Sequence, residues 1–226
     1  MRRLHVLAEG QTEEAFVNQV LAPHLAGFGV VADVRCVTTR RDRHRPDRVF
    51  RGGVREFAKV QRDLDRWMRE DGSAVFTTMI DLYALPDDFP GCADAARMND
   101  PYARVRHLER SMAETLGGDR LIPYIQLHEF EALLFSDPEK FDWHYIEHAP
   151  QIERLAVLAN QSRADRRRRA DRAVQAHHRE IPEYAFQKTT AGPLIAGRIG
   201  IQTMRARCPH FAQWIGKLEA LAGKPD

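Results

Sequence analysis

The stretch Leu4-His5-Val6-Leu7-Ala8-Glu9-Gly10-Gln11-Thr12-Glu13-Glu14 decides the fold of this 226-residue chain. Its apolar half predicts a short strand, and the residues after Glu9 predict a turn followed at once by a helix. An apolar or small residue would end the strand at lower cost than Glu9 does. Because open α/β sheets bind their ligands at the carboxyl ends of strands, Glu9 is the first candidate active-site residue.

Working outward, strands and helices alternate four times along the first 135 residues. Apolar and β-branched runs predict strands at 4–8, 30–37, 74–80 and 121–127, and helical periodicity predicts helices at 13–26, 54–70, 101–116 and 129–135. The polar, arginine-laden segment 38–51 predicts a loop. This alternation predicts an α/β fold with a mostly parallel, four-stranded, Rossmann-like sheet and helices on both faces.

The alternation weakens after Pro138, where the sequence predicts a helical C-terminal extension. A helix is expected at 151–160, an arginine-rich helix or loop at 162–179, and two helices broken at Pro209 within 192–221. We therefore expect an α/β domain at 1–140 and a helical extension at 141–226 packed on it.

Composition excludes several classes of protein. Hydrophobic residues at 43% and charged residues at 29% are typical of a water-soluble globular protein, and no apolar run approaches the roughly 20 residues that span a membrane. Three widely separated cysteines argue against a disulfide framework or structural zinc site, and with no apolar leader this predicts a cytoplasmic protein without a membrane partner. A net charge of +2 predicts a poor stand-alone nucleic-acid binder.

Acidic residues follow three of the four predicted strands: Glu9, Asp81, and the pair Glu129 and Glu131. Parallel strands end at one edge of a sheet, so these carboxylates should share a site, where their mutual repulsion favours a hard divalent cation such as Mg²⁺ or Mn²⁺. With two metals, such a site can activate a water and stabilise the leaving oxygen in phosphodiester cleavage. Against this interpretation, strand-end acids also occur in solvated loops, and Glu131 can face solvent on its helix.

The same residues resemble the motifs of the Toprim fold. Glu9-Gly10-Gln11-Thr12-Glu13 is similar to its glutamate motif, the strand ending at Asp81 to its aspartate motif, and Glu129-x-Glu131 to its third acidic motif. The chain resembles more closely a bacterial family known as domain of unknown function 4276. That resemblance rests on the following stretches: Glu9 to Phe16, Thr77 to Tyr83, Pro123 to Asp137, and Cys208-Pro209-His210-Phe211.

This family looks Toprim-like and similar to the nuclease half of OLD (overcoming lysogenization defect) proteins. The resemblance implies a divalent-metal-dependent nuclease that acts on DNA or RNA beside a partner ATPase of the AAA/ABC type in bacterial defence against phage. A homodimer is compatible with it.

Residue by residue, the resemblance implies that Glu9 is a metal ligand or acid–base group and that Glu13 is a second ligand. Asp81 would be the central ligand, with Glu129 and Glu131 completing the site. Acids in a first helical turn also stabilise a helix without further role, which is the alternative for Glu13.

One position departs from the Toprim pattern. The aspartate motif usually has two aspartates one residue apart, and Tyr83 stands at the second place. Either Asp87 or Asp88 replaces it, or the site binds one metal, or the protein is a non-catalytic regulatory subunit of an ATPase complex.

Basic residues supply the last candidates. Lys188, one of five lysines, can steady a phosphate or the charge of a transition state as a catalytic residue; the alternative is a surface lysine before a helix. The arginine runs at 40–51 and 163–172 can contact phosphates or form a solvated face. No glycine-rich nucleotide loop is present, so ATP hydrolysis is not expected in this chain. A weaker alternative is a phosphatase or phosphotransfer enzyme that acts on a small molecule.

Overall fold

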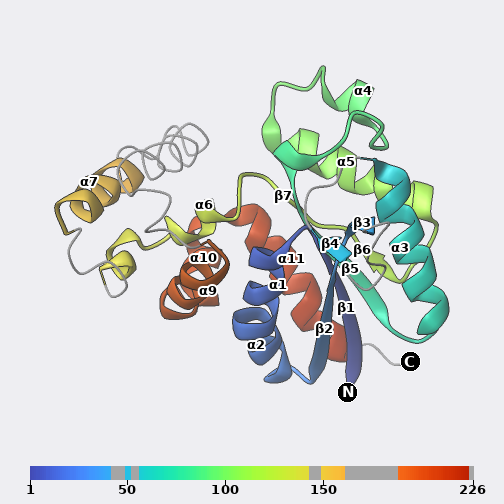
Figure 1. The fold of residues 1–226 in the computed structure, drawn as a ribbon, viewed down its shortest axis with the longest axis horizontal. Coiled ribbons are helices and arrows are strands. Elements are labelled where there is room, and N and C mark those ends of the chain that lie inside the picture. Colours follow the sequence, from blue (N-terminus) through green and yellow to red (C-terminus); the bar gives the residue numbers. More distant parts are fainter. Residues whose placement is uncertain (42–48, 52–55, 143–148, 161–187, 224–226) are drawn as a thin grey trace.

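A parallel sheet runs through the centre of the molecule (Figure 1). The computed structural model describes residues 1–41, 49–51, 56–142, 149–160 and 188–223. The strand order is β2-β1-β5-β6, with β7 also paired to β5, and each of these pairs is parallel. The strands are β1 (Arg2–Ala8), β2 (Val30–Cys36), β5 (Val75–Asp81), β6 (Leu121–Ile122) and β7 (Ile125–Gln126). The predicted α/β fold with a mostly parallel sheet is confirmed.

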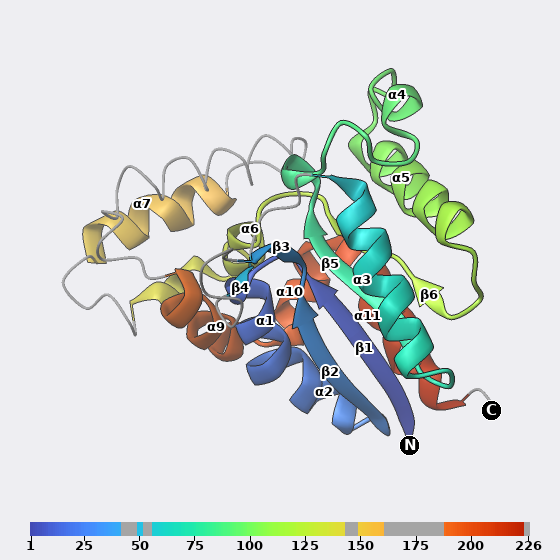
Figure 2. The same cartoon turned by 45° about the vertical axis from the view of Figure 1, so that its right-hand side comes forward.

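Helices cover both faces of the sheet, as predicted (Figure 2). One face is covered by the continuous helix α1 (Gln11–Phe16), η1 (Val17–Leu21, a π-helical turn) and α2 (Ala22–Ala26). The other face is covered by α3 (Phe57–Glu70) and α5 (Pro101–Leu116). Since side chains alternate along a strand, β1 sends Leu4, Val6 and Ala8 to the first face and Leu7 to the second.

The fourth predicted strand, 121–127, is interrupted at Pro123-Tyr124, which separates β6 from β7. Proline lacks the N–H that a ladder needs. Side chains of β5 replace the missing bonds: Thr77 Oγ1 donates to the Ile122 carbonyl at 2.6 Å, and Thr78 Oγ1 donates to the Tyr124 carbonyl at 2.8 Å and accepts from its N–H at 2.9 Å. The interruption therefore leaves β7 firmly attached to β5.

The prediction of a loop at 38–51 is wrong for those residues of the segment that the structure describes. Strands β3 (Thr38–Arg41) and β4 (Val49–Arg51) pair antiparallel. Threonine, valine and phenylalanine at the two ends favour strands, and the many arginines between them obscured that signal. The remaining short helices before the C-terminal part are η2 (Leu82–Ala84) and α4 (Cys92–Ala95).

The C-terminal part is helical, as predicted, but the segment expected to form two helices forms three. Gly200, with φ +79°, ends one helix before the next begins, in addition to the predicted break at Pro209. The helices are α6 (Glu131–Leu134), η3 (Pro138–Phe141), α7 (Ala149–Asn160), α9 (Lys188–Ile199), α10 (Ile201–Arg207), α11 (Pro209–Glu219) and η5 (Ala220–Gly223). The predictions for 162–187 lie outside the described residues.

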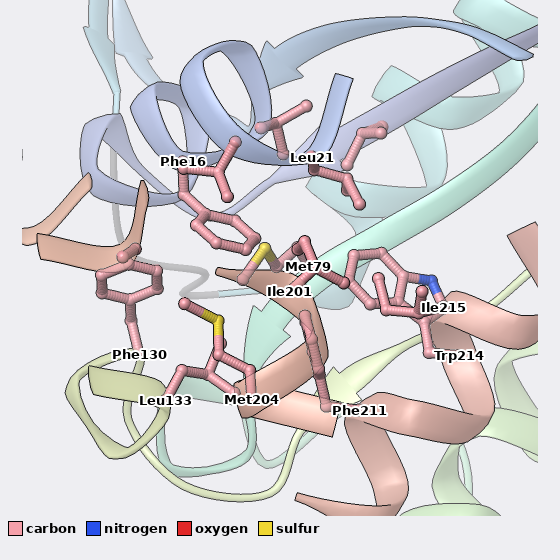
Figure 3. Close-up of a cluster of buried hydrophobic side chains, with 14 of the residues drawn as sticks. Phe16, Leu21, Met79, Phe130, Leu133, Ile201, Met204, Phe211, Trp214 and Ile215 are labelled. Atoms are coloured by element: carbon pink, nitrogen blue, oxygen red, sulfur yellow. The ribbon is translucent and has the colours of Figure 1, made fainter. Parts of the chain in front are cut away.

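One buried cluster joins the C-terminal helices to the sheet (Figure 3). Phe16 of α1 and Met79 of β5 meet Phe211 and Trp214 of α11 there. The Trp214 indole N–H donates to Thr77 Oγ1 at 2.8 Å. The boundary at residue 140 remains a prediction, but the helices beyond it supply part of the core beneath the sheet. Across the described ranges, no helix combines the length and apolarity that a membrane crossing requires.

Candidate functional site

The first two acids meet where β1 and β5 end. Ala8 is paired with Met79, so the residues that follow β1 and β5 begin side by side. The Glu9 N–H donates to the Met79 carbonyl at 3.0 Å, and the Asp81 N–H donates to Glu9 Oε2 at 3.0 Å. Glu9 and Asp81, 72 residues apart in the sequence, are therefore neighbours.

Glu13 projects from the first turn of α1 and is 8% exposed. Its Oε2 accepts a hydrogen bond from the Gly10 N–H at 3.0 Å, so the Glu13 side chain caps the start of the helix. The capping role considered from the sequence is thus present. Burial, together with the charges of Glu9 and Glu131, nevertheless raises the pKa of Glu13 to about 7.

Asp81 lies among all the other predicted acids. Burial raises its pKa well above the ordinary value, and the charges of Glu13, Glu9, Glu131 and Glu129 raise it further. The pKa of Glu9 is also raised, by burial first and by the charge of Glu129, against a lowering by the hydrogen bond from Asp81. The structure therefore brings Glu9, Glu13, Asp81, Glu129 and Glu131 into one electrostatic group, called here the acidic cluster.

The acidic cluster has the chemistry of a cation site without a complete set of converged ligands. Within the described residues, Glu9, Glu13 and Asp81 form no ion pair with a basic side chain, and the buried Asp81 Oδ1 accepts no hydrogen bond. Carboxylate oxygens suit hard divalent cations. However, no group of three or more His, Cys, Asp or Glu side chains in the described part is arranged closely enough to hold a metal ion. Metal binding would thus require carboxylates of the cluster to rotate.

Other candidates lie elsewhere. Tyr83 is 57% exposed in η2, at the place of the second Toprim aspartate. Asp88 Oδ1 accepts from the Phe57 N–H at 2.9 Å and so caps α3, while Asp87 is exposed. Lys188 is the first residue of α9, and its side chain lies outside what the structure describes. Helix α9 packs on α1. It also lies close to Phe130, because a Cβ added at Gly192 of α9 would lie 3.2 Å from Phe130 Cε1.

A buried polar group beside the acidic cluster was not predicted. Tyr124 and Gln126 hydrogen-bond through their side chains, and Tyr124 stacks on Trp214 with ring centroids 4.1 Å apart. Glu109 Oε1 accepts from the Ile125 N–H at 2.9 Å and lies 2.8 Å from His210 Nε2. A glutamine between Ile125 and Leu127 in an apolar strand is the sequence signal that could have indicated this group.

Fold and site together define an α/β protein with acidic residues at the carboxyl edge of a parallel sheet. The chain belongs to the family described as "Domain of unknown function (DUF4276)", whose match spans residues 8–219. Among solved structures, the C-terminal region of the Xanthomonas campestris pv. campestris OLD protein is similar, at 13% identity and a TM-score of 0.41 over 96% of this chain and 95% of that chain. Comparison with curated proteins finds no match.

Proposed function

We propose that this protein is a divalent-metal-dependent phosphodiesterase of Toprim type, a nuclease that acts on DNA or RNA. The observation that carries the proposal is the acidic cluster: the pKa values of Glu9, Glu13 and Asp81 are raised by burial and by the charges of their acidic neighbours, Glu129 and Glu131 among them. A fold gains nothing from carboxylates that are crowded together out of water, so their presence favours a ligand that neutralises them.

The proposed ligands are Glu9, Glu13, Asp81, Glu129 and Glu131, and the proposed cation is Mg²⁺ or Mn²⁺. When bound, the cation would neutralise the cluster and lower the pKa of a water for attack on a phosphodiester. Asp81 is its central ligand because the other four charges act on it. Glu9, held by the Asp81 N–H through one oxygen, keeps its second oxygen for a metal or a proton.

Substrate contacts would come from basic residues near this edge. Lys188 begins α9, which packs against α1, and in this proposal it offsets the negative charge that develops on the phosphate. Because the net charge is only +2, tight nucleic-acid binding is assigned to a partner, and the OLD-like motifs suggest an ATPase of the AAA/ABC type in anti-phage defence.

The test is cleavage of labelled single- and double-stranded DNA and RNA by the purified chain with Mg²⁺ or Mn²⁺, alone and with a candidate partner ATPase of the AAA/ABC type. We expect cleavage that EDTA abolishes and that Glu9→Gln and Asp81→Asn remove. Asp88→Asn is the matched control, because that carboxylate caps α3 instead of joining the cluster. Absence of cleavage under every metal and partner condition would overturn the proposal.

A second candidate is a non-catalytic subunit that regulates an ATPase. The exposed Tyr83 at the second aspartate position and the lack of a converged ligand trio in the described residues favour it. It predicts that Asp81→Asn leaves the protein's protective effect against phage unchanged in cells, whereas the nuclease proposal predicts loss of protection.

A further inference from the structure

Gln126 occupies the position beside Asp81 in the sheet. Strands β5 and β7 pair in parallel with Ile80 opposite Ile125 and Asp81 opposite Gln126. Ile80 and Ile125 both pack in the cluster under α3 and α5. Because side chains alternate along strands, Asp81 and Gln126 face the opposite side, together with Tyr124 and the α11 helix.

Burial of Gln126 needs a reason, since it is only 4% exposed between two apolar neighbours. A buried amide is costly unless its polar atoms are used, and an apolar residue would complete this strand at lower cost. The Tyr124 hydroxyl hydrogen-bonds to Gln126 Oε1. Tyr124 is buried and its pKa is raised well above the ordinary value, mainly by burial, so its phenol remains a donor. The amide oxygen is thereby occupied, which turns the amide nitrogen away from Tyr124.

Among the described residues, the buried Asp81 Oδ1 has no hydrogen-bond partner. The Gln126 side chain bonds to Tyr124 through its oxygen, which leaves its amide N–H groups as the donors on this side of the sheet. We propose that Gln126 is a positioning residue of the acidic cluster, which supplies its amide N–H groups to the ionised Asp81 carboxylate while Tyr124 fixes its oxygen. An amide suits this place because it donates hydrogen bonds without adding charge to five clustered acids. The inference rests on the proposed metal site.

The experiment measures Mn²⁺ affinity by calorimetry, and thermal stability, for the wild type, Gln126→Met and Tyr124→Phe. Methionine keeps the length and burial of the side chain but has no N–H donor. We expect Mn²⁺ to bind about 10- to 100-fold more weakly to Gln126→Met, the usual effect of losing an outer-shell partner. Tyr124→Phe retains the stack on Trp214 and should weaken Mn²⁺ binding by less than Gln126→Met does, because the amide donor is kept.

Thr77→Val is the matched control. It removes a buried hydroxyl from β5 that bonds to Ile122 and Trp214, so it should lower the melting temperature and leave Mn²⁺ affinity unchanged. An equal loss of Mn²⁺ affinity in Thr77→Val would indicate general loosening and overturn the positioning role. Wild-type Mn²⁺ affinity in Gln126→Met would also overturn the positioning role. If Gln126→Met does not fold, wild-type Mn²⁺ affinity in Tyr124→Phe would overturn it.

The outcome also separates this inference from the proposed nuclease. A wild type that binds Mn²⁺ but cuts no nucleic acid overturns the nuclease, and the affinities of the variants still decide the role of Gln126. A wild type that binds no Mn²⁺ overturns both.

Discussion

The two ends of the β1–β5 strand pair treat their acidic residues in opposite ways. At the amino end, Asp71 lies 3.0 Å from His5 Nε2 and 2.9 Å from the Arg3 guanidinium, and it accepts from the Ser73 N–H at 3.2 Å. These contacts, led by the hydrogen bond with His5, hold the pKa of Asp71 well below its ordinary value. At the carboxyl end, Asp81 lies among four acids and its pKa is raised.

The difference separates an acid with a structural role from the acid that we propose as a metal ligand. Asp71 joins the end of α3 to β1 and is ionised with partners that favour its charge. Asp81 receives no such compensation from the described residues, so the folded chain without a cation is less stable than it would be with a neutral residue there. Strain of this kind is typical of sites retained for a ligand.

The largest expected effect comes from exchanging these two acids for amides. Asp81→Asn should weaken Mn²⁺ binding by about 100-fold or more, since a ligand matters more than an outer-shell partner. It should also raise the melting temperature of the metal-free protein, by about 2–4 °C for each kcal/mol gained in a chain of this size. Calorimetry and thermal unfolding in EDTA measure both.

Asp71→Asn should do the reverse: it lowers the melting temperature and leaves Mn²⁺ affinity unchanged, because Asp71 lies at the other end of the strands. If both variants shifted stability in the same direction, the contrast between the two ends would not hold.

The second prediction concerns pH. A carboxyl whose pKa rises from 4.5 in the unfolded chain to about 7 in the folded one makes the folded state less stable as pH rises through that window. For Glu13 the full shift corresponds to up to about 3 kcal/mol. The metal-free protein should therefore unfold at a higher temperature at pH 5.5 than at pH 8, opposite to ordinary acid destabilisation.

Glu13→Gln should make this profile less steep, because glutamine still accepts from the Gly10 N–H but does not titrate. The raised pKa values of Glu9 and Asp81 keep the remaining slope in the same direction. The lowered pKa of Asp71 acts below its unfolded value of 3.8, outside the window. A profile that rises from pH 5.5 to 8 in EDTA would contradict the electrostatic account of the acidic cluster. Mn²⁺ should restore stability at pH 8.

The smallest predicted effect tests how α9 supports the cluster. A Cβ at Gly192 would lie 3.2 Å from Phe130 Cε1, and Phe130 is buried between Glu129 and Glu131 in the sequence. In Gly192→Ala, overpacking against Phe130 should cost about 1–3 kcal/mol of folding stability, partly offset by the better helix propensity of alanine. The displaced Phe130 should weaken Mn²⁺ binding by about 2- to 5-fold.

Gly197→Ala provides the control in the same helix. Among the described residues, a Cβ there would meet only Val20 Cγ2, at an ordinary 3.9 Å. Alanine should therefore stabilise the protein by up to about 1 kcal/mol without changing Mn²⁺ affinity. Equal Mn²⁺ affinities in the two alanine variants would contradict the expectation that the packing of α9 on Phe130 supports the acidic cluster.

Much of the arrangement could be predicted because it depends on local patterns. Helical and strand periodicity located the three crossover helices, and the parallel sheet then required that Glu9 and Asp81 emerge at one edge. The predictions failed where local signals conflicted: arginines obscured β3 and β4, and Gly200 divided a segment that looked continuous.

The sequence by itself determined the α/β order of elements and the acids that end its strands, since both follow from residue type and spacing along the chain. Only the tertiary structure decided which charges compensate one another. Asp71 and Asp81 are the same residue type at two ends of one strand pair, and they differ because His5 and Arg3 pack beside the first while Glu9 and Glu13 pack beside the second. Pairing, burial and the partners of Gln126 depend on contacts between segments far apart in the sequence.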